Sequence, residues 1–159
     1  MIEQTFVAIK PDGVERALIG KVIERFEQRG LKIVAMKMVW VDRDFSKKHY
    51  SAHINKPFYK GLEDFIVSGP VVAMVIEGVN AVEYTRKIVG VTIPSEASPG
   101  TIRGDFAHQT MQHADEHGHA VVNIIHASGN KEEAKKEIDL WFDAKEIHSY
   151  KTVHEKHTF

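Results

Sequence analysis

The chain has 159 residues, of which 43% are hydrophobic and 27% are charged, enough apolar material for the core of one globular domain over residues 1–159. It contains no cysteine, which excludes disulfide bonds, thiolate catalysis and cysteine-ligated zinc. Lysine and arginine total 21 against 22 aspartate and glutamate residues, for a formal net charge of −1; because nucleic-acid-binding proteins usually carry a basic surplus, we expect no nucleic-acid partner.

The first half of the chain alternates strand-like and helix-like segments. A short strand is predicted over residues 5–9, followed by a turn at 10–13. Apolar residues then recur at helical spacing from Ile19 to Phe26, and Gly30 closes that helix. A long strand over 31–41, a short helix over 45–53 and a helix over 58–67 follow, the last one ended by the Ser-Gly-Pro sequence at 68–70.

The second half repeats the alternation. A buried strand is predicted over 71–76 and a helix over 81–89, with Asn80 as its N-cap and Gly90 as its end. Residues 92–105 read as an irregular loop, 121–125 as a strand, and the stripe Ala134, Ile138 and Phe142 as a last helix. This order predicts an α/β or α+β sandwich of the ferredoxin-like βαββαβ type, with helices covering a four-stranded antiparallel sheet.

Neither a membrane anchor nor a secretion signal is predicted. The longest apolar stretch, residues 71–76, is far shorter than the roughly 20 residues of a membrane helix, and residues 1–4 do not begin a signal peptide. We therefore expect a cytoplasmic protein that does not bind membranes.

His126 is the most informative single residue. The β-branched run over 121–125 leads directly to it, and Asn130 with Glu133 forms a capping-box-like helix start just beyond. A helix N-terminus favours an anion, phosphate above all. On local sequence alone, a histidine whose nitrogens are satisfied by the backbone at a strand end is the simpler explanation.

Glycine-rich phosphate loops of the familiar kinds are absent. Phosphate binding would therefore need side chains, and the candidates are Lys10 at the end of the first strand, Arg86 and Thr92 around one helix end, and Arg103 in the loop. Each of them, taken alone, also fits a solvated surface residue.

Several motifs, in order, resemble the nucleoside diphosphate kinase family over almost the whole chain. They are Lys-Pro-Asp-Gly-Val at 10–14, His-Tyr at 49–50, Pro-Phe at 57–58, Ser-Gly-Pro-Val-Val-Ala-Met-Val at 68–75, Ser-Pro-Gly-Thr-Ile-Arg-Gly-Asp at 98–105, Asn-Ile-Ile-His-Ala-Ser at 123–128 and Lys-Glu-Ile-Asp-Leu-Trp-Phe at 136–142. The resemblance implies transfer of the γ-phosphoryl group of a nucleoside triphosphate such as ATP to His126, and from there to a nucleoside diphosphate. An imidazole is largely neutral and nucleophilic at pH 7, and two half-reactions through one phosphohistidine give ping-pong kinetics.

The same resemblance assigns further roles. It implies that Lys10, Arg86, Thr92 and Arg103 contact the phosphates and that Asn123 binds the sugar. Phe58, with Leu62 beside it, would stack on the base, which explains a broad base tolerance because stacking reads no base edge. Tyr50 would lie near the histidine, and Glu137 would orient it through the nitrogen that does not attack. From spacing alone, Phe58 is better explained as a core residue and Glu137 as a helix-surface carboxylate.

The family pattern further implies Mg²⁺, held mainly by the nucleotide phosphates with no protein ligand, and a homo-oligomer that is a hexamer or a tetramer. Residues 106–122 are longer than that pattern and hold His108, His113, His117 and His119. This insertion could bind a transition metal if it is helical, could contact another subunit, or could be a solvated loop with incidental histidines. The alternatives for the whole protein are a non-catalytic nucleotide- or metal-binding protein of the same fold and a nucleic-acid-binding regulator.

Overall fold

A four-stranded antiparallel sheet forms the centre of the molecule, in a computed structural model that describes residues 1–159. Its strands are β1 (Ile2–Ile9), β2 (Lys32–Val39), β3 (Val71–Val79) and β4 (Ile125–Ala127). They lie in the order β2-β3-β1-β4, and every neighbouring pair is antiparallel. The predicted ferredoxin-like βαββαβ arrangement is confirmed.

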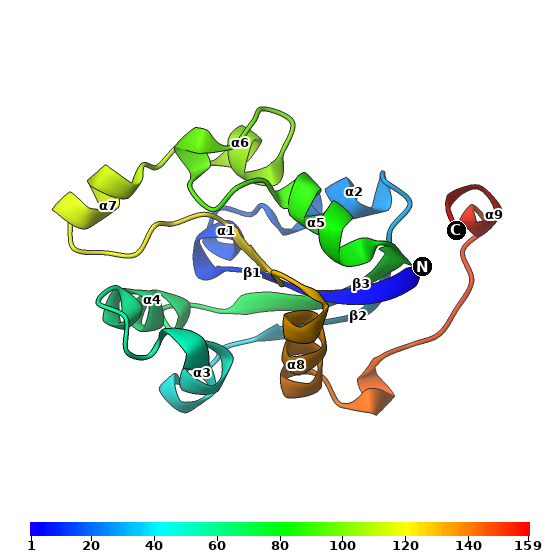
Figure 1. Cartoon of the computed structure of the whole chain (residues 1–159), viewed down its shortest axis with the longest axis horizontal. Helices are drawn as coiled ribbons and strands as arrows, with labels where there is room; N and C mark the ends of the chain where they lie inside the picture. Colours follow the sequence, from blue (N-terminus) through cyan, green and yellow to red (C-terminus); the bar gives the residue numbers. More distant parts are fainter.

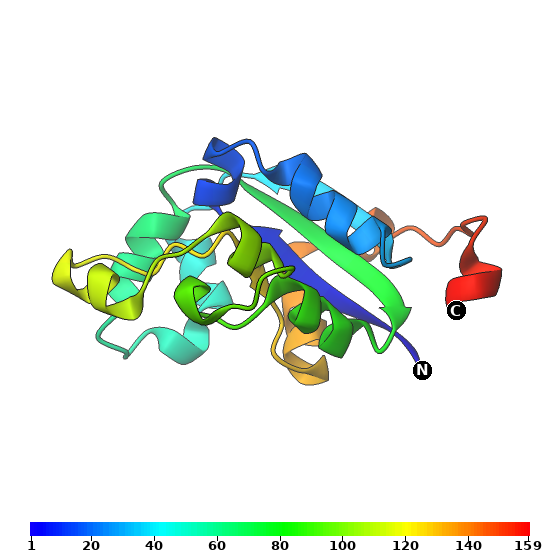
Figure 2. The ribbon, with the colours of Figure 1, turned by 90° about the horizontal axis from the view of Figure 1, so that it is seen from above.

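Helices cover both faces of the sheet (Figure 1; Figure 2 gives the view from above). In Figure 1, α1, α2, α5 and α6 lie above it, α3, α4 and α8 lie below it, and α7 extends to one side. The helices are α1 (Pro11–Glu15), α2 (Ile19–Glu27), α3 (Arg43–His49), α4 (Tyr59–Ile66), α5 (Ala81–Val89), α6 (Ile102–Phe106), α7 (Met111–Glu116), α8 (Lys131–Trp141) and α9 (Glu155–Thr158), with 3₁₀ turns at Ser51–His53, Pro94–Glu96 and Ala144–Glu146. None of these helices has the length and apolar character needed to cross a bilayer.

The alternation of side chains along β1 divides the core into two layers. Phe6 and Ala8 belong to a cluster that includes Trp141 on the α8 side, whereas Val7 and Ile9 belong to a second cluster with Phe26 on the α2 side. Successive residues of a strand point to opposite faces, so both faces of β1 are buried. The short strand β4, which contains His126, pairs with this buried strand and is therefore held in a fixed position.

Several segments differ from the sequence predictions. The irregular loop predicted over 92–105 contains the 3₁₀ turn Pro94–Glu96 and the start of α6 (Ile102–Phe106). The turn predicted at 10–13 is the first part of the helix α1, because Pro11 occupies the first helical position, where its missing N–H costs nothing. The strand predicted over 121–125 is instead β4 (Ile125–Ala127), because Ile124 adopts a left-handed conformation with φ +72°. His126 therefore lies within the short strand, paired with Ala8 of β1, rather than beyond its end.

The N-terminus of α5 is capped differently from the prediction. Asn80 adopts φ +49° and its side chain makes no capping hydrogen bond. The N–H of Val82 instead donates to the carboxylate of Glu3 at 3.2 Å. The predicted cap of α8 is confirmed, since the N–H of Glu133 donates to Oδ1 of Asn130 at 2.9 Å.

Candidate active site

His126 is held by a backbone turn that the strand sequence does not reveal. The left-handed Ile124 is fixed at both its polar groups: its carbonyl accepts from the N–H of Lys10 at 2.7 Å, and its N–H donates to Oδ2 of Asp12 at 2.9 Å. A β-branched residue pays a strain penalty in this conformation. The anchored turn fixes where β4 starts and so where the imidazole lies.

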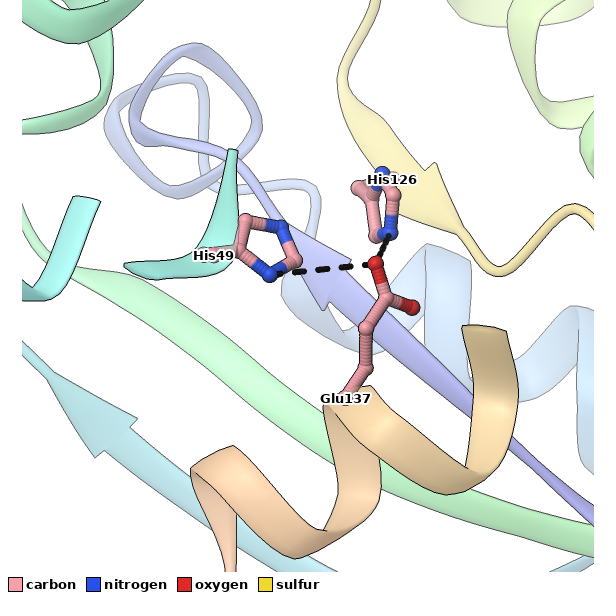
Figure 3. A group of neighbouring side chains, drawn as sticks. All are labelled: His49, His126 and Glu137. Atoms are coloured by element: carbon pink, nitrogen blue, oxygen red, sulfur yellow. Dashed lines mark hydrogen bonds and ion pairs between the residues drawn. The ribbon is translucent and has the colours of Figure 1, made fainter. Parts of the chain in front are cut away.

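The imidazole of His126 is oriented by Glu137 of α8 (Figure 3). Its Nε2 lies 2.7 Å from Oε1 of Glu137, and Oε2 of the same carboxylate accepts from Oγ of Ser128 at 2.5 Å. A carboxylate accepts only, so His126 donates from Nε2 and its lone pair is on Nδ1. Only 22% of the His126 side chain and 12% of the Glu137 side chain are exposed, which keeps both groups partly shielded from water.

A second histidine, His49, lies against the first. The two rings are 4.9 Å apart in an edge-to-face arrangement, and Nδ1 of His49 accepts from the indole N–H of Trp141 at 3.1 Å. Burial, followed by the neighbouring His126 and Lys10, holds the pKa of His49 well below its ordinary value of 6.5. His49 is therefore neutral at pH 7 and adds no second positive charge beside His126; its role was not predicted from the sequence.

Tyr50 completes this side of the site. Its ring centre lies 6.4 Å from that of His126, as the predicted proximity requires. Burial, and then the Glu137 carboxylate, raises the pKa of its hydroxyl, so Tyr50 keeps its proton at neutral pH. The buried hydroxyl has no hydrogen-bond partner within the protein, which leaves it free to bind a group that enters the site.

Lys10 and Asn123 form a polar pair next to the histidine. Nζ of Lys10 donates to Oδ1 of Asn123 at 2.8 Å, and Nδ2 of Asn123 donates to the carbonyl of Thr92 at 2.9 Å. Burial, followed by the nearby Arg103, lowers the pKa of Lys10 from its ordinary value of 10.5 to about 8, and Asp12 partly opposes both effects. The ammonium is thus charged at pH 7 but poorly solvated, a state that a phosphate would relieve.

Arg103 is bound to the backbone more extensively than the sequence suggested. Its guanidinium donates to the carbonyls of Asn123 at 3.2 Å, Gly90 at 2.9 Å and Ile125 at 2.6 Å. Burial, followed by Arg86, lowers its pKa to about 10, which leaves it charged at neutral pH. Arg103 therefore links the loop to the start of β4 and also carries positive charge to the site.

The remaining predicted side chains are more accessible. Arg86 and Thr92 are exposed, and Phe58 just before α4 is 54% exposed, so core packing is excluded as its role. Leu62 lies one turn further along α4 and is half-buried. Exposed aromatic and arginine side chains are well suited to contact a ligand.

All ten predicted site residues line one cavity of about 770 Å³. They are Lys10, Tyr50, Phe58, Leu62, Arg86, Thr92, Arg103, Asn123, His126 and Glu137. The cavity thus combines an imidazole with an available nitrogen lone pair, several basic side chains and an exposed aromatic ring. Such a site is that of a nucleotide phosphotransferase.

Comparisons with known proteins agree with this class. A family model described as nucleoside diphosphate kinase matches residues 3–147. The nucleoside diphosphate kinase of Pyrococcus furiosus is 52% identical over 149 residues, which cover 94% of this chain and 88% of the relative. The chain therefore belongs to the nucleoside diphosphate kinase family, and the predicted family and phosphotransferase activity are confirmed.

Solved structures of the family have the same fold. A structure of the Borrelia burgdorferi nucleoside diphosphate kinase, described as a transition state mimic with bound vanadate and ADP, is similar with a TM-score of 0.96 and 42% identity, covering 99% of this chain and 96% of that one. A halophilic nucleoside diphosphate kinase from Halobacterium salinarum in complex with CDP gives a TM-score of 0.87 and 40% identity, covering 98% and 97%. These similarities do not favour the alternative of a non-catalytic protein of the same fold.

Sequence reasoning missed three contributors to the site: His49, Asp12 and Ser128. All three stand within motifs shared with the family, but no local pattern indicates that His49 and Ser128 contact the His126–Glu137 pair. Asp12 and Ile124 are 112 positions apart, and a single sequence carries no signal for such a contact.

Proposed function

We propose that His126 is the nucleophile of a ping-pong nucleoside diphosphate kinase. Its Nδ1 lone pair attacks the γ-phosphorus of a nucleoside triphosphate such as ATP; the Nδ1–P bond forms as the bond from phosphorus to the bridging oxygen breaks, and the diphosphate leaves. A second nucleoside diphosphate then takes the phosphoryl group by the reverse step. The 2.7 Å contact between Nε2 of His126 and Glu137 carries this proposal, because it leaves Nδ1 as the nucleophilic nitrogen.

Glu137 is proposed to act through His126. When Nδ1 is phosphorylated and Nε2 keeps its proton, the ring becomes positively charged. A carboxylate bound to Nε2 stabilises that charge as it develops. Tyr50, whose hydroxyl is neutral and unpaired within the protein, is proposed to donate a hydrogen bond close to the reacting group.

The basic residues are proposed to bind the polyphosphate. Lys10 and Arg103 supply buried positive charge, and the exposed Arg86 supplies a guanidinium fork suited to phosphate oxygens. Thr92 lines the same cavity and adds a hydroxyl donor. Phosphoryl transfer is catalysed mainly by positioning and by neutralising charge on the transferring oxygens, and these side chains supply both.

Base and sugar are proposed to bind at the other residues of the cavity. The exposed ring of Phe58, flanked by Leu62, would stack on the base, and Asn123 would bind the sugar hydroxyl. Stacking accepts every base because each has a π-face. Broad base tolerance follows from the absence of any edge-reading contact in this assignment.

Mg²⁺ is proposed to be held mainly by the nucleotide phosphates. The ligand atoms of His49, His126 and Glu137 lie within 4.8 Å of one another, but two of the three are nitrogens and Mg²⁺ prefers oxygen ligands. The lysine and arginine side chains of the cavity suit phosphate oxygens, which in turn suit Mg²⁺. When bound with the nucleotide, Mg²⁺ neutralises charge on the phosphoryl oxygens.

We also propose that residues 1–159 act as one domain, which the packing of both core clusters on the same sheet supports. A cytoplasmic location is proposed because nucleoside di- and triphosphates are made and used there. A homo-oligomer, hexamer or tetramer, is proposed from family membership. Sedimentation of the purified protein tests the oligomer, and sedimentation of a chain lacking residues 109–118 tests whether the insertion contributes to it.

The mechanism is tested by a labelling and chase experiment. Purified protein is incubated with γ-labelled ATP and Mg²⁺ and then chased with GDP. We expect acid-labile, alkali-stable label on the protein that moves to GTP, absent in His126→Ala and retained in His148→Ala, a histidine outside the cavity. Stable label on His126→Ala would overturn the assignment.

A further inference from the structure

Three histidines gather at the end of α7, outside the proposed catalytic residues. His113 lies in α7, His117 follows its last residue, and His119 lies just beyond the turn at Gly118. The ring centres of His113 and His117 are 4.2 Å apart, and that of His119 is 6.1 Å from each. The helical spacing that a metal site requires of His113 and His117 is therefore present.

These distances suit a single ion. With metal–nitrogen bonds of about 2.0–2.1 Å, three imidazoles on one tetrahedral ion place their ring centres about 5 Å apart. The observed values lie on either side of that figure, and all three side chains belong to exposed residues. Binding of one ion would require these exposed side chains to rotate so that their nitrogens converge.

Two of the rings have the tautomer that a metal ligand needs. Nδ1 of His117 lies 2.8 Å from the carbonyl oxygen of His113, and Nδ1 of His119 lies 2.9 Å from that of Ala120. A carbonyl only accepts, so both histidines donate from Nδ1 and carry their lone pair on Nε2. Metal-binding histidines generally fix their second nitrogen in this way.

The turn between these histidines is formed by the protein itself. Gly118 adopts φ +65°, its N–H donates to the carbonyl of Asp115 at 3.2 Å, and the N–H of His119 donates to that of Ala114 at 3.1 Å. These bonds close the C-terminal end of α7 in the way a Schellman motif does. Because the backbone is already ordered, binding would not have to supply the entropy of forming the loop.

We propose that His113, His117 and His119 form a binding site for a divalent transition metal of the Zn²⁺ class. Imidazole nitrogens select Zn²⁺, Ni²⁺ or Cu²⁺ over Mg²⁺, so the site is chemically separate from the Mg²⁺ that accompanies the nucleotide. His119 and Asp115 also line the nucleotide cavity, and a carboxylate this close favours a cation. The site therefore lies at the rim of that cavity, where a bound ion would stiffen the insertion.

The test is calorimetric titration of the full chain with Zn²⁺ in excess Mg²⁺. We expect one equivalent of Zn²⁺ in the wild type and none in the triple variant His113→Gln, His117→Gln, His119→Gln. The single variant His119→Gln should weaken binding by about tenfold or more, since even an outer partner of a metal-binding histidine is worth about 10- to 100-fold in affinity. Kinase activity with Mg²⁺ alone should survive in the double variant His113→Gln, His117→Gln, whose residues do not line the nucleotide cavity, and this separates the proposal from the catalytic one.

The matched control replaces three histidines of the C-terminal segment, His148→Gln, His154→Gln and His157→Gln, and should bind Zn²⁺ as the wild type does. Zn²⁺ binding that persists in the variant lacking His113, His117 and His119 overturns the proposal, as does loss of binding in the control. An unchanged affinity for Zn²⁺ in His119→Gln also overturns the proposal, because His113 and His117 of α7 would then bind the ion without His119.

A second control asks whether Zn²⁺ binds at the catalytic histidine. Zn²⁺ binding that is lost in Glu137→Gln places the ion beside His126 and overturns the proposal. Zn²⁺ binding that is unchanged in Glu137→Gln supports it.

Discussion

Replacing Glu137 by glutamine should slow phosphorylation of His126 without removing the side chain that holds the imidazole. The carboxylate accepts from Nε2 of His126 at 2.7 Å and from Oγ of Ser128 at 2.5 Å. A glutamine can keep its oxygen toward His126 and turn its amide N–H groups toward Ser128, whose hydroxyl also accepts. The geometry is therefore preserved and only the negative charge is lost.

The size of the effect follows from that charge. A hydrogen bond to an ionised group contributes about 1.5–3 kcal/mol, whereas one between neutral groups contributes about 0.5–1.5 kcal/mol. The difference, about 1–2 kcal/mol, applies to the transition state, in which the ring becomes positive. Since about 1.4 kcal/mol corresponds to a factor of ten in rate, we expect Glu137→Gln to phosphorylate His126 about 5- to 30-fold more slowly.

Single-turnover quenched-flow measurement of phosphohistidine formation from ATP measures this rate directly. The matched control is Glu132→Gln, the same change at an exposed position of the same helix, which should behave as the wild type does. The affinity for ATP should be nearly unchanged, because Glu137 does not face the phosphates in our assignment. A wild-type rate in Glu137→Gln, or a loss confined to KM, would refute the reasoning.

Three further predictions follow from other residues of the cavity. Lys10→Met should remove most activity yet raise the free energy of unfolding, by up to about 3 kcal/mol, because burial lowers the pKa of Lys10 from 10.5 to about 8. The gain in the free energy of unfolding should be complete below pH 8 and fade toward pH 10.5. The reason is that the unfolded wild-type chain binds the Lys10 proton more tightly than the folded one, so the wild type regains stability as pH rises. Denaturant titrations that show equal gains at pH 7 and pH 10 would contradict this reasoning. Phe58→Ala should raise KM about 5- to 150-fold, by similar factors for ADP, GDP and CDP, from a stacking contribution of about 1–3 kcal/mol, whereas a change for one base only would exclude stacking. Arg103→Lys should lower the free energy of unfolding by about 2 kcal/mol, because a lysine cannot satisfy all three carbonyls, and thermal melting should show a Tm lower by about 4–8 °C.

The fold was predictable because its local signals agree with its tertiary packing. The helical stripe from Ile19 to Phe26 and the apolar run of β3 both give buried faces, and Gly30 and Gly90 adopt the positive φ that a helix end favours. The error at residues 121–125 has a single cause. Ile124 has a strong strand preference, but its contacts with Lys10 and Asp12 hold it in a left-handed turn, so tertiary structure overrides local preference.

The candidate site was predictable as a list of residues but not as a set of contacts. Motifs shared with the family named Arg103 and Asn123 as ligands of the nucleotide, yet they could not show that Arg103 binds the carbonyl of Asn123 or that Lys10 binds its side chain. These contacts join segments 20 and 113 positions apart. One sequence contains periodicity and motifs, but no record of which distant residues meet.

Three positions beside the segment that carries His126 are energetically unfavourable in the free protein. Ile124 is held in a conformation that costs about 1–2 kcal/mol for a residue with a Cβ, and Lys10 is charged in a place that lowers its pKa. Oδ1 of Asp12 is buried without a hydrogen-bond partner in the protein. All three adjoin the segment that carries His126, and the two packed core layers offset their cost. A polyphosphate next to Lys10 would turn the buried ammonium from a destabilising charge into a paired one, so part of the binding energy of the substrate would offset the desolvation of Lys10.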